Sequence, residues 1–165
     1  IGKAHFNRKQ GMEITQDLEY RIPGPTRRPL VLFAVVTNNG GHYVGNIKIG
    51  PVSARDGVAN VLVKIRDESY WEAGIATEAI RLATRYAFSY LSLRRLTAVA
   101  RACDVAAVRA HEEAGFQVEG IRGGQTPGRG SDWDQALMGM AAVDWSAQVP
   151  LTLPLRRASE ESLAA

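Results

Sequence analysis

Apolar and polar residues recur with one period before residue 75 and with another after it. Three runs rich in apolar and β-branched residues precede that point, at residues 30–36, 42–49 and 58–65. Such runs bounded by turn residues predict strands, and the two asparagines and two glycines at 38–41 predict a hairpin between the first two. Gly45, inside the second run, predicts a bulge or a close backbone approach. We therefore expect an antiparallel meander in the middle of the chain.

Helical periodicity begins at Ile75. Apolar residues recur there at intervals of three and four as far as Tyr90, which predicts an amphipathic helix of about four turns. Asp104 suits a helix N-cap and Gly115 suits a left-handed stop, so the residues between them predict a second helix. The other predicted elements are a strand at 96–100, a strand from Phe116, a loop rich in Gly and Pro at 123–130, and a last strand at 135–143.

The two ends of the chain have weaker patterns. Residues 1–29 are polar and mixed, and we expect one short helix there, around residues 12–20. Residues 144–165 carry two prolines, a basic pair and an acidic pair, and we expect a tail that is partly disordered or packs on a neighbour. Residues 1–143 are thus predicted to form a single domain.

The order of the predicted elements indicates the fold class. Strands that first form a meander and then alternate with helices predict an α/β fold with a mixed, mostly antiparallel, twisted sheet. We expect helices on both faces of this sheet and right-handed crossovers in its second half. A chain of 165 residues with 45% hydrophobic content suits one such domain with a substantial core.

Composition narrows the classes of function. The net charge of +3 and the pI near 9.2 exclude an acidic protein and fall short of the basic stripe that a nucleic-acid binder needs. Cys103 is the only cysteine, so we expect neither an internal disulfide nor a Cys-rich zinc site. No apolar run approaches the roughly 20 residues that span a bilayer, and no signal pattern opens the sequence. We expect a soluble, cytoplasmic protein with no membrane partner, no nucleic-acid partner and no metal.

The candidate chemistry lies at residues 67–79, which join a predicted strand directly to the long helix. A helix N-terminus presents unpaired amides and the positive end of the macrodipole, and both favour anions. Gly74 and Ala76 are small enough to let a diphosphate reach the backbone. Each amide bonded to a charged oxygen contributes about 1.5 to 3 kcal/mol, so three or four suffice for a micromolar complex before association costs. A diphosphate site here needs no cationic side chain.

The motifs around this turn follow a recognisable order. The turn and its Thr77-Glu78-Ala79 helix start are followed by a strand, the Asp104 cap, and the run from Glu112 to Phe116. Further matches are Tyr70-Trp71, Val118-Glu119-Gly120 and Asp132-Trp133-Asp134. Over residues 30–143 the chain resembles the GNAT acetyltransferases, and within them the branch of ribosomal-protein N-terminal acetyltransferases. The resemblance implies acetyl-CoA as co-substrate and direct transfer of its acetyl group to an amine.

The resemblance also implies which residues bind acetyl-CoA. The family's cofactor loop corresponds to residues 71–76, and the strand before it pairs its backbone with the pantetheine arm. The residues assigned in this way are Ile65, Arg66, Trp71, Glu72, Ala73, Gly74, Ile75, Ala76, Thr77, Asp104 and Ala107. Glu72 and Ala73 depart from the usual Gly-Lys pair, and Asp104 replaces an asparagine that, unlike an ionised aspartate, donates hydrogen bonds.

The catalytic groups are less clearly defined by the resemblance. Asn60 stands where many members carry a glutamate, and Ala107 replaces a serine of the ribosomal-protein branch. His111 occupies the position of a tyrosine that protonates the departing thiolate in many members, a role that suits an imidazole; the alternative is a partly exposed helix histidine. Glu119, Asp132 and Asp134 are the other candidates, as bases or as anchors for the acceptor amine, and each also suits a structural or surface position.

Three functions remain open on the sequence. The first is acetylation of a primary amine, on a small molecule such as an antibiotic or amino sugar, or on a protein N-terminus; the missing serine favours a small molecule. The second is a non-catalytic acyl-CoA-binding module of the same fold, and the third is an unrelated nucleotide-binding α/β domain.

A homodimer with a paired C-terminal strand is compatible with the resemblance. We also expect Cys103 to be buried, His42 to lie on the surface, and Trp133 and Trp145 to pack in the core or at a dimer contact.

Overall fold

A computed structural model describes residues 5–7, 12–18, 30–37, 41–71, 73–123 and 134–148 of the chain. Several sequence predictions lie outside these residues, namely those for Glu72, Asp132 and Trp133, for most of the hairpin turn and of the loop at 123–130, and for the tail beyond residue 148.

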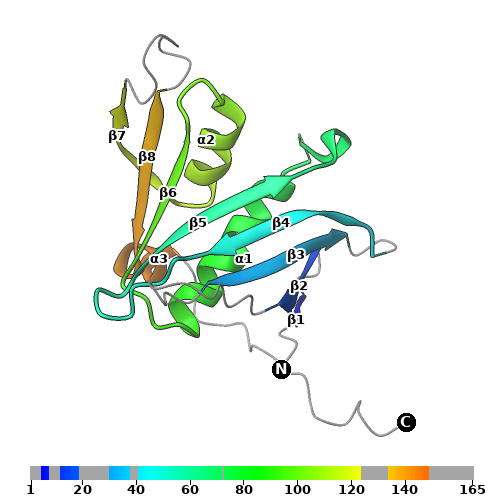
Figure 1. Cartoon of the computed structure of the whole chain (residues 1–165), viewed down its shortest axis with the longest axis horizontal. Helices are drawn as coiled ribbons and strands as arrows, with labels where there is room; N and C mark the ends of the chain where they lie inside the picture. Colours follow the sequence, from blue (N-terminus) through cyan, green and yellow to red (C-terminus); the bar gives the residue numbers. More distant parts are fainter. Residues whose placement is uncertain are drawn as a thin grey trace, which may run out of the picture.

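Eight strands form one mixed sheet in the described part of the chain, in the order β1-β2-β3-β4-β5-β6-β8-β7 (Figure 1). Every neighbouring pair is antiparallel except β5 and β6, which run parallel. The strands are β1 (His5–Asn7), β2 (Met12–Leu18), β3 (Val31–Thr37), β4 (Tyr43–Ile49), β5 (Val58–Ile65), β6 (Arg95–Arg101), β7 (Gln117–Arg122) and β8 (Gln135–Ala141). The predicted α/β class, the mixed sheet and the central meander are confirmed.

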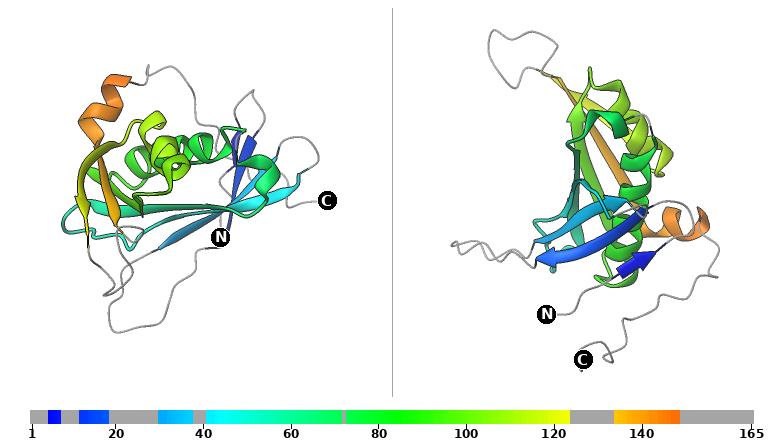
Figure 2. Two further views of the ribbon diagram at one scale, coloured as in Figure 1. Left: turned by 90° about the horizontal axis from the view of Figure 1, so that it is seen from above. Right: turned by 90° about the vertical axis from the view of Figure 1, so that its right-hand side faces the viewer.

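The helices of the described residues are the short 3-10 helix η1 (Glu68–Tyr70) and the α-helices α1 (Ile75–Ser89), α2 (Val105–Glu113) and α3 (Ala142–Gln148). The three α-helices lie on one face of the sheet in both views of Figure 2, whereas the sequence predicted helices on both faces. The core forms beneath them, because alternating side chains of β3, β4, β5, β6 and β8 on that face are buried, including Phe33, Ile47, Leu96 and Met138.

Two predictions for the ends of the chain were wrong. Residues 12–18 form β2 rather than a helix, because they pair with the edge of β3. The sequence of this short segment does not show that such a partner strand is available. The last strand ends at Ala141 rather than at residue 143, and Ala142–Gln148 form α3, which includes the first residues of the predicted tail. Trp145 of α3 packs against Phe88 with ring centroids 5.5 Å apart, so the packed structure extends beyond residue 143.

Local signals placed the two main helices correctly. The helix α1 begins at Ile75 directly after Gly74, whose φ is +72°. The Asp104 side chain caps α2 by accepting a hydrogen bond from the amide of Ala107 at 3.1 Å. Gly115 has φ +103° and ends the helix in the left-handed conformation, as predicted.

The sheet opens between β5 and β6. Their parallel pairing runs from Val58 opposite Arg95 to Val61 opposite Ala98 and then stops. Beyond that point residues 62–65 of β5 stay paired with β4, while residues 99–101 of β6 stay paired with β8. Figure 1 shows the two strands diverging, with α1 starting after the end of β5 and α2 after the end of β6. The opening therefore lies between the starts of the two helices.

Gly45 sits where β4 supports the diverging part of β5, opposite Ile65. A bulge at this point places Val35 opposite Gly45 and Val36 opposite Tyr43. A Cβ added to Gly45 would overlap the main-chain oxygen of Lys64 and lie 2.9 Å from the Cα of Ile65. Both the predicted bulge and the predicted close approach are thus confirmed.

We predict that Gly45→Ala lowers the free energy of unfolding by about 2 kcal/mol or more, because backbone must move to accept the methyl group. Gly120→Ala is the matched control, since a Cβ there meets no atom within 4 Å. It should change the free energy of unfolding by less than about 1 kcal/mol. Urea unfolding measures both, and equal effects of the two variants would contradict the close approach at Gly45.

Candidate active site

The first turn of α1 presents free main-chain amides. Gly74 is the N-cap residue and no side chain caps it. Within the described residues, nothing accepts a hydrogen bond from the amides of Gly74, Ile75 and Ala76. A Cβ at Gly74 would meet no atom within 4 Å, so the backbone is open to an incoming group. Unpaired amides at the positive end of a helix form a site for an anion such as a diphosphate.

The edge of β5 that faces the opening also carries unpaired groups. In an antiparallel ladder, successive residues direct their N–H and C=O groups alternately to the two sides of the strand. The amide of Arg66 donates to the Val44 oxygen of β4 at 2.9 Å, so alternation turns the main-chain groups of Val63 and Ile65 away from β4. Beyond Val61 there is no pairing with β6, and these groups therefore face the opening.

Trp71, one of the residues assigned to cofactor binding, lies beside the free edge of β5. Its side chain is 56% exposed, and its Nε1 donates to the main-chain oxygen of Ile65 at 3.3 Å. The indole thus occupies one of the acceptors on the free edge of β5 and leaves the amide of Ile65 available. Arg66 follows with an exposed side chain, and Ala73 is exposed beside Gly74.

Thr77 differs from its neighbours in the predicted cofactor loop. It is only 6% exposed, and its hydroxyl donates to Oε2 of Glu113, on α2, at 3.2 Å. A hydroxyl has a single proton to donate, so this side chain is committed to α2 rather than to a phosphate. Only the main-chain amide of Thr77 remains for an anion.

Asp104 and Ala107 lie on the β6 side of the opening, at the start of α2. Both main-chain groups of Ala107 are engaged, because its amide donates to Asp104 and its oxygen accepts from Nδ1 of His111 at 2.8 Å. These two residues shape the start of the helix, and their assignment to cofactor binding stays a prediction.

His111 lies in the interior and is 3% exposed, which contradicts the alternative of a partly exposed histidine. Its Nδ1 hydrogen-bonds Ala107, its ring meets Phe116 edge-on at 5.5 Å, and its buried Nε2 has no hydrogen-bond partner within the described residues. Burial lowers the pKa of the imidazole, and the bond to Ala107 only partly opposes this. The neutral ring is therefore favoured, which is the wrong form for a proton donor.

Glu119 lies on β7 and Asp134 lies immediately before β8, so neither belongs to a strand that borders the opening. Glu119 on β7 forms an ion pair with Arg95, and the pair crosses β8 where Gly139 leaves room for it. Two strands, β8 and β6, separate β7 from the opening. Asp134 precedes β8, and one of its carboxylate oxygens lies beside Gly123, which follows β7. The structure does not gather the three predicted catalytic residues, and their roles stay predictions.

Asn60 lies at the base of the opening, where β5 and β6 are still paired. Its Nδ2 donates to Oγ1 of Thr97 at 3.4 Å, and the Thr97 hydroxyl in turn lies 3.4 Å from the main-chain oxygen of Ala59. The side chain thus links the two strands just before they diverge.

Comparison with known proteins identifies the family. A family model described as an acetyltransferase (GNAT) domain matches residues 7–117. The chain belongs to the GNAT acetyltransferases. It is accordingly an acetyltransferase, and its acetyl donor is acetyl-CoA. None of the curated proteins compared with it matches the chain.

Solved structures share the fold of this acetyltransferase. Spermidine N-acetyltransferase from Vibrio cholerae in complex with CoA and spermine is 20% identical, with a TM-score of 0.63 over 71% of this chain and 68% of that chain. A dodecameric form of the same enzyme in an intermediate state is also 20% identical, with a TM-score of 0.64 over 73% of this chain and 70% of the other.

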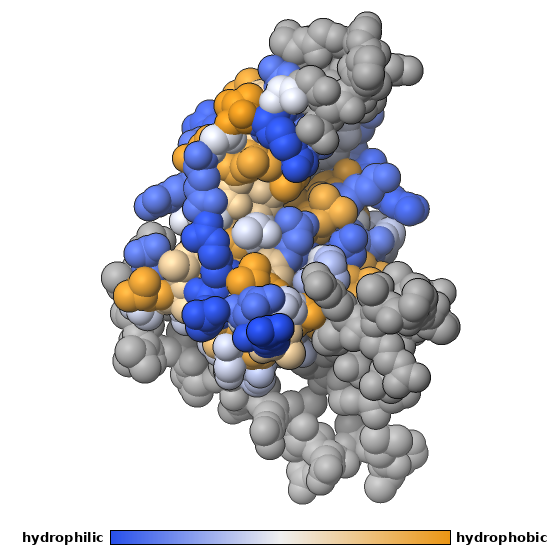
Figure 3. Space-filling view, turned by 60° about the vertical axis from the view of Figure 1, so that its left-hand side comes forward, coloured by the Kyte–Doolittle hydropathy of each residue, from blue (hydrophilic) through white to orange (hydrophobic). Residues whose placement is uncertain are grey.

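The surface of this acetyltransferase has mixed character. Figure 3 shows apolar side chains exposed beside hydrophilic ones on one face, and Val118 and Ile121 of β7 are among the exposed apolar residues of the protein. His42 is exposed, as predicted, and so is Cys103, which was predicted to be buried.

The described residues hold no cluster of three or more His, Cys, Asp or Glu side chains that could bind a metal. None of their helices is both long and apolar enough to span a bilayer.

Sequence reasoning missed three features of the site. The free main-chain groups of Val63 depend on where β6 diverges, and no residue type marks that point. The contact of Glu113 with Thr77 joins residues that are 36 positions apart. The pairing of Glu119 with Arg95 depends on a glycine in a third strand. Only the last had a signal, the single glycine inside the predicted final strand.

We predict that His111 makes the folded protein less stable in mild acid. Its pKa is lowered by folding, so the unfolded chain binds the proton first, and stability falls as pH drops through the unfolded value near 6.5. The stability that the neutral His111 contributes is fully present above about pH 7.5. Below that pH the free energy of unfolding falls on its account by at most about 1.4 kcal/mol per pH unit. The free energy of unfolding of His111→Leu should therefore fall less between pH 7.5 and 5.5 than that of the wild type. Parallel curves for the two proteins would show that His111 is not held neutral.

Proposed function

We propose that this acetyltransferase transfers the acetyl group to a primary amine, with a small-molecule amine as the first choice and a protein N-terminus as the second. The observation that carries the proposal is the row of free amides at the start of α1, placed beside the unpaired edge of β5. One surface binds anions and the other binds an extended amide-containing chain, which matches the two parts of coenzyme A.

The residues present fit this co-substrate. The amides of Gly74, Ile75 and Ala76 would hold the diphosphate, and the open space at Gly74 gives it access. The amides of Val63 and Ile65 would bind oxygens of the pantetheine arm. When bound, acetyl-CoA supplies a thioester carbonyl that an amine attacks directly. The edge of β5 that is not paired with β6 would hold that carbonyl in one orientation, and orientation accounts for most of the catalysis in such a transfer.

The acceptor amine must be neutral to react. Neutralising a lysine-like amine with a pKa near 10.4 at pH 7 costs about 4.6 kcal/mol, whereas an α-amine near 7.8 costs about 1.1 kcal/mol. His111 is buried, Glu119 is ion-paired, and Asp134 lies just before β8, so none of the candidate bases belongs to a strand that borders the opening. An amine of low pKa, or one deprotonated through water, suits this site best.

Different observations support small-molecule amines and protein N-termini as the acceptor. The solved structures with this fold include an enzyme crystallised with spermine, and polyamines are small molecules with primary amines. The resemblance to the ribosomal-protein branch favours an α-amine instead, and the substitution of its serine by Ala107 weakens that reading. Self-association is also proposed, since the related enzyme has a dodecameric form.

We predict that Gly74→Leu abolishes measurable CoA binding, because the side chain enters the space from which the diphosphate reaches the amides. Gly41→Leu is the matched control: Gly41 also has a positive φ, +65°, and open space around its Cβ position, but it lies at the β3–β4 hairpin. Both variants carry the same backbone strain of about 1 to 2 kcal/mol. Calorimetry with CoA should separate them, and equal binding by both would place the diphosphate elsewhere.

We predict release of free thiol from acetyl-CoA in the presence of at least one primary amine. A panel should contain spermidine, spermine, amino sugars, aminoglycosides and peptides with free N-termini, and thiol release should depend on both the amine and the intact Gly74. Thiol release with the peptides alone would favour the ribosomal-protein branch. CoA binding without turnover across the whole panel would instead support the non-catalytic acyl-CoA-binding module.

A further inference from the structure

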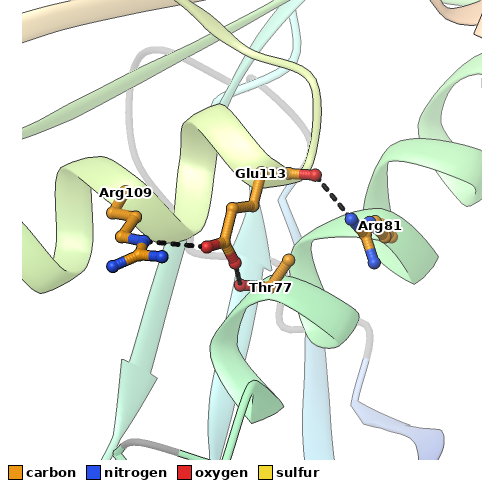
Figure 4. A network of polar contacts seen from close by, with 4 residues as sticks. All are labelled: Thr77, Arg81, Arg109 and Glu113. Atoms are coloured by element: carbon orange, nitrogen blue, oxygen red, sulfur yellow. Dashed lines mark hydrogen bonds and ion pairs between the residues drawn. The ribbon is translucent and has the colours of Figure 1, made fainter.

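The helices α1 and α2 are joined by a polar network centred on Glu113, the last residue of α2 (Figure 4). One carboxylate oxygen accepts from the hydroxyl of Thr77 at 3.2 Å, and the other accepts from Nε of Arg109 at 2.9 Å. The main-chain oxygen of Glu113 accepts from a terminal guanidinium nitrogen of Arg81 at 2.6 Å. Two residues of α1 thus contact the same residue of α2, one through its carboxylate and one through its backbone.

The carboxylate contact lies in the turn that the co-substrate needs. Thr77 is the third residue of α1, next to the free amides of Ile75 and Ala76, and its side chain is buried. By contrast, Arg81 lies one turn farther along the helix, at an exposed position. The first turn of a helix lacks intrahelical partners for its amides and is held less firmly than the turns that follow. A bond from another helix to this turn therefore restricts the direction of its amides.

We propose that Glu113 is a positioning residue, which fixes the first turn of α1 against α2 so that the free amides point in the direction the diphosphate requires. The proposal rests on the function proposed above. Glu113 acts through Thr77 and need not touch the co-substrate. In this arrangement the free amides belong to a rigid element. Binding of the co-substrate then costs less free energy, because the turn is already ordered.

The hydrogen bond, rather than the charge, carries this role. The negative charge of the Glu113 carboxylate would oppose binding of the diphosphate. Arg109 partly neutralises this charge, because it pairs with the carboxylate. The side chains of the Arg109–Glu113 pair are 76% and 47% exposed, so solvent screens their attraction. The bond from the buried Thr77 is the part of the network that solvent screens least. An uncharged acceptor at position 113 should accordingly keep the function.

The first experiment compares four variants with the wild type: three single variants and the double variant Thr77→Val with Glu113→Ala. Calorimetry with CoA should show a dissociation constant about tenfold higher for Thr77→Val and for Glu113→Ala, as expected for one lost hydrogen bond to a charged group. Glu113→Gln should bind within about threefold of the wild type, because its amide oxygen still accepts from Thr77. The double variant should bind no more weakly than either single one, because both remove the same bond. With any acceptor found by the amine panel, the KM for acetyl-CoA should rise in the same proportion while kcat changes less than about twofold.

Arg81→Ala is the matched control, since it removes a bond to the same residue of α2 without touching the carboxylate or Thr77. It should leave CoA binding within about twofold of the wild type. Hydrogen exchange of the free protein gives a readout independent of the co-substrate, and the amides of residues 74–77 should exchange about tenfold faster in Glu113→Ala. Thermal unfolding of each variant verifies that it is folded.

Two kinds of result would overturn the positioning role. One is wild-type CoA binding by both Thr77→Val and Glu113→Ala; the other is equal weakening by Arg81→Ala, which would mean that helix packing alone matters. The Gly74→Leu variant in the same assay separates these results from a failure of the proposed function. If Gly74→Leu also binds CoA normally, the diphosphate site itself is wrong. If it does not bind while the Thr77 and Glu113 variants bind normally, only the positioning role fails.

Discussion

The site depends on one constraint, the end of parallel pairing between β5 and β6. Each strand keeps its other neighbour, so the sheet stays continuous while two of its strands diverge. Main-chain groups that a closed sheet would pair with each other are then left unpaired along the edge of β5. Buried unpaired backbone groups are unfavourable in a protein interior, and such an edge persists where water or a ligand reaches it. The opening therefore selects a ligand that is itself extended and rich in amides.

Placement of α1 turns this edge into a two-part site. The helix begins ten residues after β5 ends, so its free amides lie at the same end of the sheet as the opening. A ligand that spans both features needs an anionic group and an extended arm in fixed order. Neither feature depends on a charged side chain, which explains how the unusual Glu72 and Ala73 of the cofactor loop are compatible with membership of the family.

Sequence reasoning succeeded where the signal is local. Three helix ends were predicted correctly: the start of α1 after Gly74, the cap of α2 at Asp104 and its stop at Gly115. Each of them is determined by residues within one turn of that helix end. It failed where the answer depends on distant partners. The edge of β3 decides the conformation of residues 12–18, and packing of α2 on the sheet decides the burial of His111. The family resemblance pointed to the turn at the start of α1, whose role in cofactor binding stays a prediction, but it could not show that the hydroxyl of Thr77 bonds to α2.

The arrangement of titratable groups bears on how the reaction is catalysed. A general base usually contributes about 10² to 10⁴ in rate, and it must lie within hydrogen-bond reach of the proton it removes. The candidate groups do not meet this condition, since His111 is buried, Glu119 is ion-paired, and Asn60 at the base of the opening is bonded to Thr97. Rate enhancement would then come mainly from orientation, since a well-placed pair of reactants gains more than a base supplies. Rigidity of the main chain around the opening is accordingly the property that catalysis requires, and the contacts that hold α1, α2 and β5 in place matter as much as any group that reacts.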